Sequence, residues 1–322
     1  MNSDSEYSNY VMDSFEFESG RILENVNVEY WVRGTPQYDD DGNISNVVVY
    51  FPNFKSENSI LVEFHNQIYN EFMDDYFFIK ITALGVPNSC APSSTGLKYD
   101  FPQYTLKDRV NFKRQFLKEK FNIDKVLGLI GERVAGFEVY TWACEYPDEM
   151  DFIISLNTTF KTYGYRYVLL NVVDSIIDSS DDFYRDEYSV SISKLMVIIS
   201  RLTFLGNFPK NVFEELSNDE IDVLMADYVD DGLFMDIYDF KSRNDCLLRY
   251  DVFDKLKDIT AKALIMGSSD YLYFNNEKDI LPLNDIIECS KIALFKDKEN
   301  FYDEYDYSDI SSEVISFLRQ FK

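Results

Sequence analysis

A six-residue segment near the middle of the chain has the residue pattern of a turn that holds a catalytic nucleophile. It reads Gly131-Glu132-Arg133-Val134-Ala135-Gly136, after the apolar run Val126–Ile130 and before a stretch of helical character. In turns of the form G-x-S-x-G, small residues let a strand and a helix approach, and the strained central residue points into a cleft. The small residues are present here, but the central residue is Arg133. An arginine guanidinium, with a pKa above roughly 12, cannot replace a serine hydroxyl as nucleophile.

Three segments around this turn resemble the homoserine O-acetyltransferase family. They are Leu84–Thr105, the stretch Trp142–Asp148 after the turn, and Lys262–Asp270, which looks like the family's strand that ends in its catalytic aspartate. The resemblance extends over nearly the whole chain, from Phe15 to the last helix. It implies an α/β-hydrolase fold, with a mostly parallel sheet of about eight strands flanked by helices and an inserted helical lid.

The resemblance also implies where the family's functional residues fall in this sequence. The nucleophile position falls on Arg133, and the catalytic aspartate position falls on Asp270, which is retained. The triad histidine aligns best with Phe301, in a loop without histidine, and the turn that shapes the family's oxyanion hole has Asn53 in place of its histidine-containing sequence. An arginine of the family's lid is also absent from Leu202–Gly206. The serine-dependent, two-step acyl-transfer mechanism is therefore physically unavailable to this sequence.

Arg133 has two interpretations at this point. Its planar guanidinium could hold a carboxylate or a phosphate at the floor of the cleft. Alternatively, it could form a structural ion pair with Asp270, because a buried carboxylate without its histidine needs another partner. The ion pair is the preferred prediction, since buried charges are nearly always paired.

Other candidate residues flank the turn or line the same cleft. Glu132 could act as a general acid or base if it were buried, because desolvation raises the pKa of a carboxyl group. Cys90, in a loop expected to form one wall, is either a reactive thiolate or a quiet buried thiol, and the second is preferred because no histidine is near it in sequence. The backbone N–H of Val134 is a candidate oxyanion donor. The candidate cleft residues are therefore Asn53, Cys90, Glu132, Arg133, Val134 and Asp270.

Strand-like runs alternate with longer amphipathic stretches, which is typical of a parallel sheet wrapped by helices. The predicted core comprises residues 1–157 and 257–322, and residues 158–256 form the predicted helical lid. The predicted strands are Phe15–Ser19, Val26–Val32, Val47–Phe51, Tyr76–Thr82, Val126–Ile130, Phe152–Leu156, Ala263–Met266 and Ile292–Phe295, and the clearest predicted helices are Leu106–Phe121, Ala135–Tyr146 and Ser308–Phe321.

Composition narrows the classes of partner. The net charge of −26 argues against nucleic-acid binding, which needs clustered Lys and Arg. One histidine and four widely spaced cysteines predict neither a metal site nor a disulfide framework. No apolar run reaches the roughly 20 residues of a membrane span, and the polar, acidic start is unlike a secretion signal. We therefore expect a cytoplasmic protein without a metal, cofactor or membrane partner.

Three functional hypotheses follow. The first is a catalytically inactive homologue (a pseudoenzyme) that binds a small molecule or a protein partner, with a homodimer through the lid as in the family. The second is a repurposed isomerase, lyase or cyclase that uses the backbone oxyanion donors with Asp270 or Glu132 as base. The third is residual acyltransferase or hydrolase activity, which needs a nucleophile that the sequence does not reveal.

Overall fold

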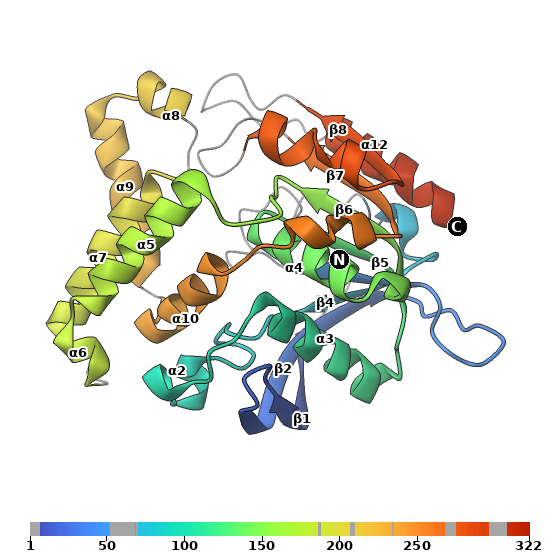
Figure 1. Ribbon diagram of the computed structural model, residues 1–322, viewed down its shortest axis with the longest axis horizontal. Helices are drawn as coiled ribbons and strands as arrows, with labels where there is room; N and C mark the ends of the chain where they lie inside the picture. The colour runs from blue at the N-terminus through green and yellow to red at the C-terminus, as the bar shows by residue number, and fades with distance from the viewer. Residues whose placement is uncertain are drawn as a thin grey trace.

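An eight-stranded sheet organises the protein (Figure 1). The computed structural model describes residues 7–51, 68, 70–185, 188–206, 210–233, 235–267, 275–295 and 308–322. The strand order is β1-β2-β4-β3-β5-β6-β7-β8; β2 runs antiparallel to β1 and β4, and all other neighbours are parallel. The strands are β1 (Ser8–Glu16), β2 (Ile22–Gly34), β3 (Val47–Phe51), β4 (Phe77–Ile81), β5 (Val126–Glu132), β6 (Met150–Leu156), β7 (Lys262–Gly267) and β8 (Ser290–Leu294).

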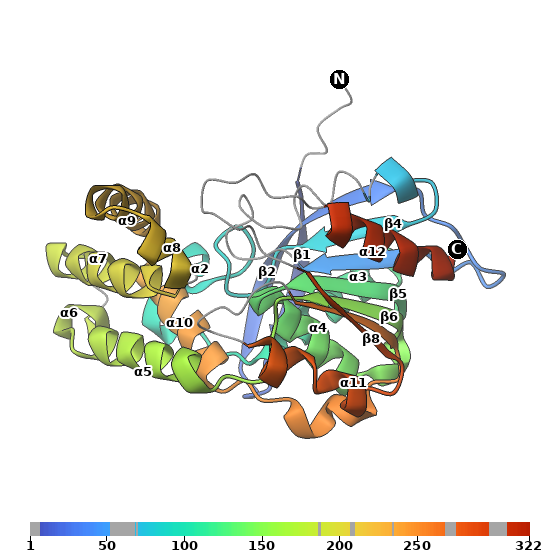
Figure 2. The ribbon, with the colours of Figure 1, turned by 90° about the horizontal axis from the view of Figure 1, so that it is seen from above.

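Helices cover both faces of this sheet, so the predicted α/β-hydrolase architecture is confirmed. Figure 2 shows α12 on one face and α3, α4 and α11 on the other. Short 3-10 or π-helical turns lie between several elements. The described helices are α2 (Pro92–Thr95), α3 (Leu106–Phe121), α4 (Val134–Glu145), α5 (Gly164–Asp178), α6 (Asp181–Tyr184), α7 (Val190–Phe204), α8 (Lys210–Glu215), α9 (Asn218–Leu233), α10 (Ile237–Leu248), α11 (Leu283–Ile286) and α12 (Ser308–Leu318).

The central strands are buried on both faces because helices pack on each side. Every residue of β3 is buried, and its sequence of three valines, a tyrosine and a phenylalanine suits a strand with apolar neighbours on both faces. Val47 and Val49 pack in the cluster beneath α3 and α4, whereas Val48 and Tyr50 pack in the cluster beneath α12. This alternation fixes the register of the strands that carry the candidate site.

Six helices, α5 to α10, lie between β6 and β7 and extend to one side of the sheet (Figures 1 and 2). The stretch that leads from β6 into this α5–α10 segment lies beside the stretch that leads from the segment back towards β7. The N–H of Val252 donates to the carbonyl of Phe160 over 3.0 Å, and the N–H of Thr162 donates to the carbonyl of Tyr250 over 2.8 Å. The entrance and the exit of the segment are thus paired with each other. The division into core and lid stays a prediction.

The first strand differs from its prediction. The sequence predicted a strand at Phe15–Ser19, whereas β1 is Ser8–Glu16 and the chain reverses just after it. The N–H of Gly20 donates to the carbonyl of Phe17, and the N–H of Phe17 donates to the carbonyl of Arg21. Because β1 is an edge strand with much of its surface exposed, its sequence carries little of the apolar alternation that predicts a strand.

Candidate functional site

The turn between β5 and α4 adopts the strained backbone of a nucleophile turn. Arg133 has φ 53° and ψ −121°, a conformation that costs a non-glycine residue roughly 1–3 kcal/mol. Three hydrogen bonds hold it there. The N–H of Arg133 donates to the carbonyl of Leu156 over 2.9 Å. The carbonyl oxygen of Arg133 accepts from the N–H of Gly136 over 3.1 Å and from the hydroxyl of Thr158 over 2.7 Å.

Small residues at both ends of the turn let α4 approach the sheet. A β-carbon added at Gly136 would lie 2.6 Å from the Thr158 hydroxyl oxygen, and one added at Gly131 would lie 2.8 Å from a methyl group of Val139. Real β-carbons do not come so close to other atoms, so an alanine at either position would push strand and helix apart. The pattern that marked this turn in the sequence therefore has a direct steric cause.

The charged residues of the turn contact each other. The side chain of Glu132 is 1% exposed and that of Arg133 is 32% exposed, and Arg133 Nε lies 3.4 Å from Glu132 Oε1. The guanidinium thus carries its charge at the surface of the turn while it compensates a buried carboxylate. Val134 is the first residue of α4, where helix N–H groups have no carbonyl of their own helix to bind.

The other predicted site residues are not brought together in the described part of the chain. Asn53, Asp270 and Phe301 lie outside the described residues, so an ion pair between Arg133 and Asp270 stays a prediction. Cys90 lies in the loop before α2 and is 3% exposed. Burial raises the pKa of its thiol to about 12, so the group is protonated at neutral pH.

Two buried contacts of carboxylates were not predicted from the sequence. The hydroxyl of Ser93 in α2 donates to Asp239 in α10, which is 1% exposed. The fully buried carboxylate of Asp279 accepts from the hydroxyls of Thr159 and Tyr163 over 2.6 and 2.8 Å. Neither contact could be predicted from a local sequence pattern, because each joins residues more than 100 positions apart.

A cluster of buried charges lies beneath the first turns of α4. The Glu138 carboxylate is 2.8 Å from the guanidinium of Arg109 and also pairs with the ammonium of Lys113, and all three side chains are buried. Burial lowers the pKa of Lys113 to about 8, although the neighbouring Glu138 acts to raise it. The cluster ties α3 to α4 and so supports the helix that begins at the turn.

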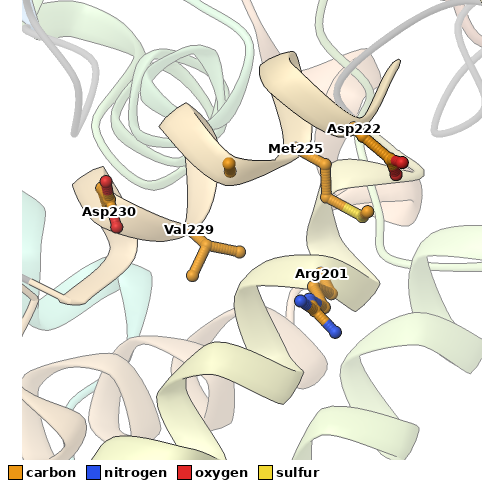
Figure 3. A pocket seen from close by; sticks show the side chains of 6 residues that line it. Arg201, Asp222, Met225, Val229 and Asp230 are labelled. Carbon is orange, nitrogen blue, oxygen red and sulfur yellow. The ribbon is translucent and has the colours of Figure 1, made fainter. Parts of the chain in front are cut away.

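A hollow of about 480 Å³ lies between α7 and α9, within the α5–α10 segment (Figure 3). Its lining combines one arginine with two aspartates and three apolar side chains, and it includes none of the candidate residues of the turn. We therefore do not regard this hollow as part of the candidate site at the turn. The lining residues are Arg201, Asp222, Met225, Ala226, Val229 and Asp230.

Neither a metal centre nor a membrane span is found within the described residues. No group of three or more His, Cys, Asp or Glu side chains in that part of the chain is placed to hold a metal ion. No helix there combines the length and the apolar character needed to cross a membrane.

Comparison with known proteins shows relatives along the whole chain. A protein of Methanothermobacter thermautotrophicus named "Probable acyltransferase" is 34% identical over 315 residues, which cover 97% of each chain. A homoserine O-acetyltransferase of Sulfurimonas autotrophica is 25% identical over 210 residues, 58% of this chain and 55% of the relative. The crystal structure of homoserine O-acetyltransferase from Bacillus anthracis superposes with a TM-score of 0.80 at 16% identity and covers 98% of both chains. No family model matches the sequence.

These relatives correct the first functional hypothesis. The expected loss of the family's serine and histidine led us to predict an inactive homologue, but the relatives are named as enzymes, one of them over 97% of the chain. The second hypothesis, an isomerase, lyase or cyclase, is not favoured either, because the names indicate acyl transfer. The error came from ranking inactivity above the catalytic hypotheses on the ground that one mechanism was expected to be lost. The chain belongs to the family of α/β-hydrolase-fold proteins that includes the "Probable acyltransferase" of Methanothermobacter thermautotrophicus.

Proposed function

We propose that this protein is an acyltransferase that moves an acyl group from a bound donor directly to a bound acceptor. The observation that carries the proposal is the turn at Arg133, which keeps the strained backbone of a nucleophile turn while it holds a guanidinium. A chain gains nothing in stability from such a conformation, so strain at a turn between strand and helix is a mark of function. The name of the relative from Methanothermobacter thermautotrophicus supplies the reaction class.

The chemistry needs no covalent intermediate with the protein. An amine or hydroxyl of the acceptor attacks the acyl carbonyl, and the new bond forms as the bond to the donor's sulfur or oxygen breaks. The proton lost by the acceptor balances the one gained by the leaving group. Negative charge develops on the carbonyl oxygen, and the N–H of Val134, at the start of α4, is suited to receive it because the helix N-terminus is electropositive.

Arg133 has a separate role in this proposal. Its guanidinium cannot attack a carbonyl group, but its planar donors match a phosphate or a carboxylate. The side chain is 32% exposed, and its Nε lies 3.4 Å from Glu132 Oε1, so the guanidinium is within reach of the solvent at the turn. We propose that it binds the anionic part of the donor, such as the phosphates of an acyl-coenzyme A thioester.

Three described candidates, the Cys90 thiol and the hydroxyls of Thr158 and Ser93, are not suited to act as an alternative nucleophile. Cys90 is protonated at neutral pH because burial raises the pKa of its thiol to about 12. The Thr158 hydroxyl is bound to the Arg133 carbonyl, and the Ser93 hydroxyl is bound to Asp239. Direct transfer therefore agrees better with this site than a double displacement.

Bisubstrate kinetics test the proposal. Acetyl- and succinyl-coenzyme A serve as donors, and homoserine, other hydroxyl- or amine-bearing amino acids, and water alone serve as acceptors; products are identified by mass spectrometry. Varying both substrates should give intersecting reciprocal plots, and the donor alone should leave the mass of the protein unchanged. A fluorophosphonate probe should not label the native protein.

Variants of Arg133 sharpen the test. Arg133→Ala should raise the KM for the donor by about tenfold or more. Arg133→Lys keeps the positive charge but lacks the paired N–H donors of the guanidinium, so it should have an intermediate effect. Parallel reciprocal plots with an acylated protein would show that the transfer is not direct. Background rates with every donor and acceptor pair would remove the acyltransferase proposal altogether.

A further inference from the structure

Thr158 lies directly beneath the strained turn, although it belongs to the segment that follows β6. It follows β6 by two residues, and the chain is turned towards α4 by Asn157, which has φ 49° and whose N–H donates to the carbonyl of Met266 over 2.9 Å. Thr158 is 1% exposed, and its side chain fills the space that the missing side chain of Gly136 leaves open. Its hydroxyl donates to the carbonyl oxygen of Arg133 over 2.7 Å.

This hydrogen bond acts on the peptide unit that joins Arg133 to Val134. A peptide bond is planar and trans, so the carbonyl of Arg133 and the N–H of Val134 are rigidly coupled and point in opposite directions. A donor that fixes the carbonyl on the buried side therefore fixes the direction in which the N–H points. Hydrogen bonds in such chains also polarise one another, so an N–H becomes a better donor when the carbonyl of its own peptide accepts a strong bond.

We propose that Thr158 is a positioning residue for the N–H of Val134. Its hydroxyl orients and polarises the 133–134 peptide, so that the N–H is a stronger donor to the oxygen on which charge develops during acyl transfer. The catalytic part of this inference rests on the proposed function, whereas the effect on the peptide does not. The second donor to the same carbonyl, the N–H of Gly136 at 3.1 Å, is longer and belongs to the turn itself, so Thr158 is the side chain that can be varied.

The effect on the peptide can be measured without any activity. The sequence has arginine followed by valine at two places, Arg109–Val110 and Arg133–Val134. Protein labelled with carbonyl-¹³C arginine and ¹⁵N valine should therefore give two signals in a two-dimensional HNCO spectrum, and Val134→Ile should remove one of them and so assign it. Val110, in the middle of α3, serves as the internal control.

Thr158→Val keeps the shape of the side chain but removes the hydroxyl, and Thr158→Ser keeps the hydroxyl. In Thr158→Val the amide proton of Val134 should move upfield and its exchange with solvent should change, whereas the Val110 signal should stay in place. Thr158→Ser should leave the Val134 amide proton near its wild-type position. An unmoved Val134 signal in Thr158→Val, or equal shifts in both variants, would overturn the inference.

Steady-state kinetics test the catalytic part of the proposal. Thr158→Val should lower kcat about tenfold with little change in KM, less than the roughly hundredfold loss typical when an oxyanion donor is removed altogether. Thr158→Ser should retain most of the rate. If no donor and acceptor pair reacts even with the wild type, the proposed function fails while the amide signal still decides the role of Thr158. If Thr158→Val does not fold, a Thr158→Ser variant with a displaced Val134 signal would still contradict the proposal.

Discussion

The Ser93 hydroxyl donates to one carboxylate oxygen of Asp239 over 2.5 Å, and the Ser93 N–H donates to the other over 2.8 Å. This contact joins α2, which lies between β4 and α3 in the chain, to α10 of the α5–α10 segment. Burial raises the pKa of Asp239 to about 6, although both hydrogen bonds from Ser93 act to lower it. The charged neighbours oppose each other, since Asp236 raises the pKa of Asp239 and Arg243 lowers it.

The raised pKa predicts a dependence of stability on pH. A carboxyl group whose pKa is higher in the folded than in the unfolded state contributes stability below its unfolded pKa of about 4, and this is lost as the pH rises through about 6. Asp239→Asn keeps an oxygen acceptor but cannot ionise. The free energy of unfolding of this variant, relative to wild type, should rise between about pH 4 and pH 7. If urea unfolding gave parallel profiles of stability against pH for the wild type and Asp239→Asn, the raised pKa of Asp239 would be contradicted. Ser93→Ala removes a hydrogen-bond donor to the carboxylate and should raise the pKa of Asp239 further.

Arg133 and Glu132 should be energetically coupled. Arg133→Met removes the cation 3.4 Å from a carboxylate that is 1% exposed, and we expect a loss of about 1–3 kcal/mol in the free energy of unfolding. Glu132→Gln in the same chain should recover part of this loss, because it removes the buried charge. Chemical unfolding of both single variants and the double variant measures the coupling. Strictly additive losses would mean that the two side chains do not stabilise each other.

The buried cluster at Glu138 should be far more sensitive to substitution than a surface ion pair. Glu138→Gln leaves Arg109 and Lys113 buried without their carboxylate, which should destabilise the protein by about 3–5 kcal/mol. The matched control is Asp151→Asn, which breaks an exposed pair with Lys125 and should cost about 0–1 kcal/mol. Thermal unfolding of both variants decides this, and equal losses would show that burial of the Glu138 cluster has no energetic consequence.

Self-association through the α5–α10 segment remains a prediction, and one face of α5 makes it testable. Tyr165, Val168 and Val172 are 68%, 57% and 42% exposed, and their spacing places them on the same side of the helix. Exposed apolar side chains that gather on one face are typical of contact surfaces. Val168→Glu combined with Val172→Glu should shift sedimentation towards the monomer, whereas Val223→Glu, on α9, should not. A wild-type protein that sediments as a monomer at micromolar concentration would contradict the prediction.

The central sheet could be predicted from the sequence, because its inner strands are continuous apolar runs. The apolar runs at Val47–Phe51 and Val126–Ile130 are buried on both faces, and the small residues of the turn at Arg133 are dictated by steric contact with Val139 and Thr158. The edge strand β1 was misplaced because its exposed residues show no clear alternation. Functional class was also misjudged, since a missing side chain excludes one mechanism and says nothing of others.

The supporting contacts of the site could not be predicted in the same way. Thr158 is an ordinary residue in the sequence, and its role depends on the strand order that places β6 beside β5. A signal was nevertheless present. A glycine at position 136 of α4 indicates that another segment packs closely against the helix there. The residues that follow β6, the strand beside β5, are the first candidates for that segment. Glu138 is similar, because its two cationic partners come from α3 and only the packing of α3 on α4 unites them.

The paired entrance and exit of the α5–α10 segment bear on how such a protein can be rebuilt. Phe160 bonds to Val252, and Thr162 bonds to Tyr250, so the two chain ends are separated by no more than the spacing of neighbouring strands, about 5 Å. A short turn is long enough to span that gap. A shorter connection could therefore join β6 to β7 at this point, but it would have to replace the apolar contacts that Cys246 and Leu247 of α10 make in the cluster beneath α3 and α4.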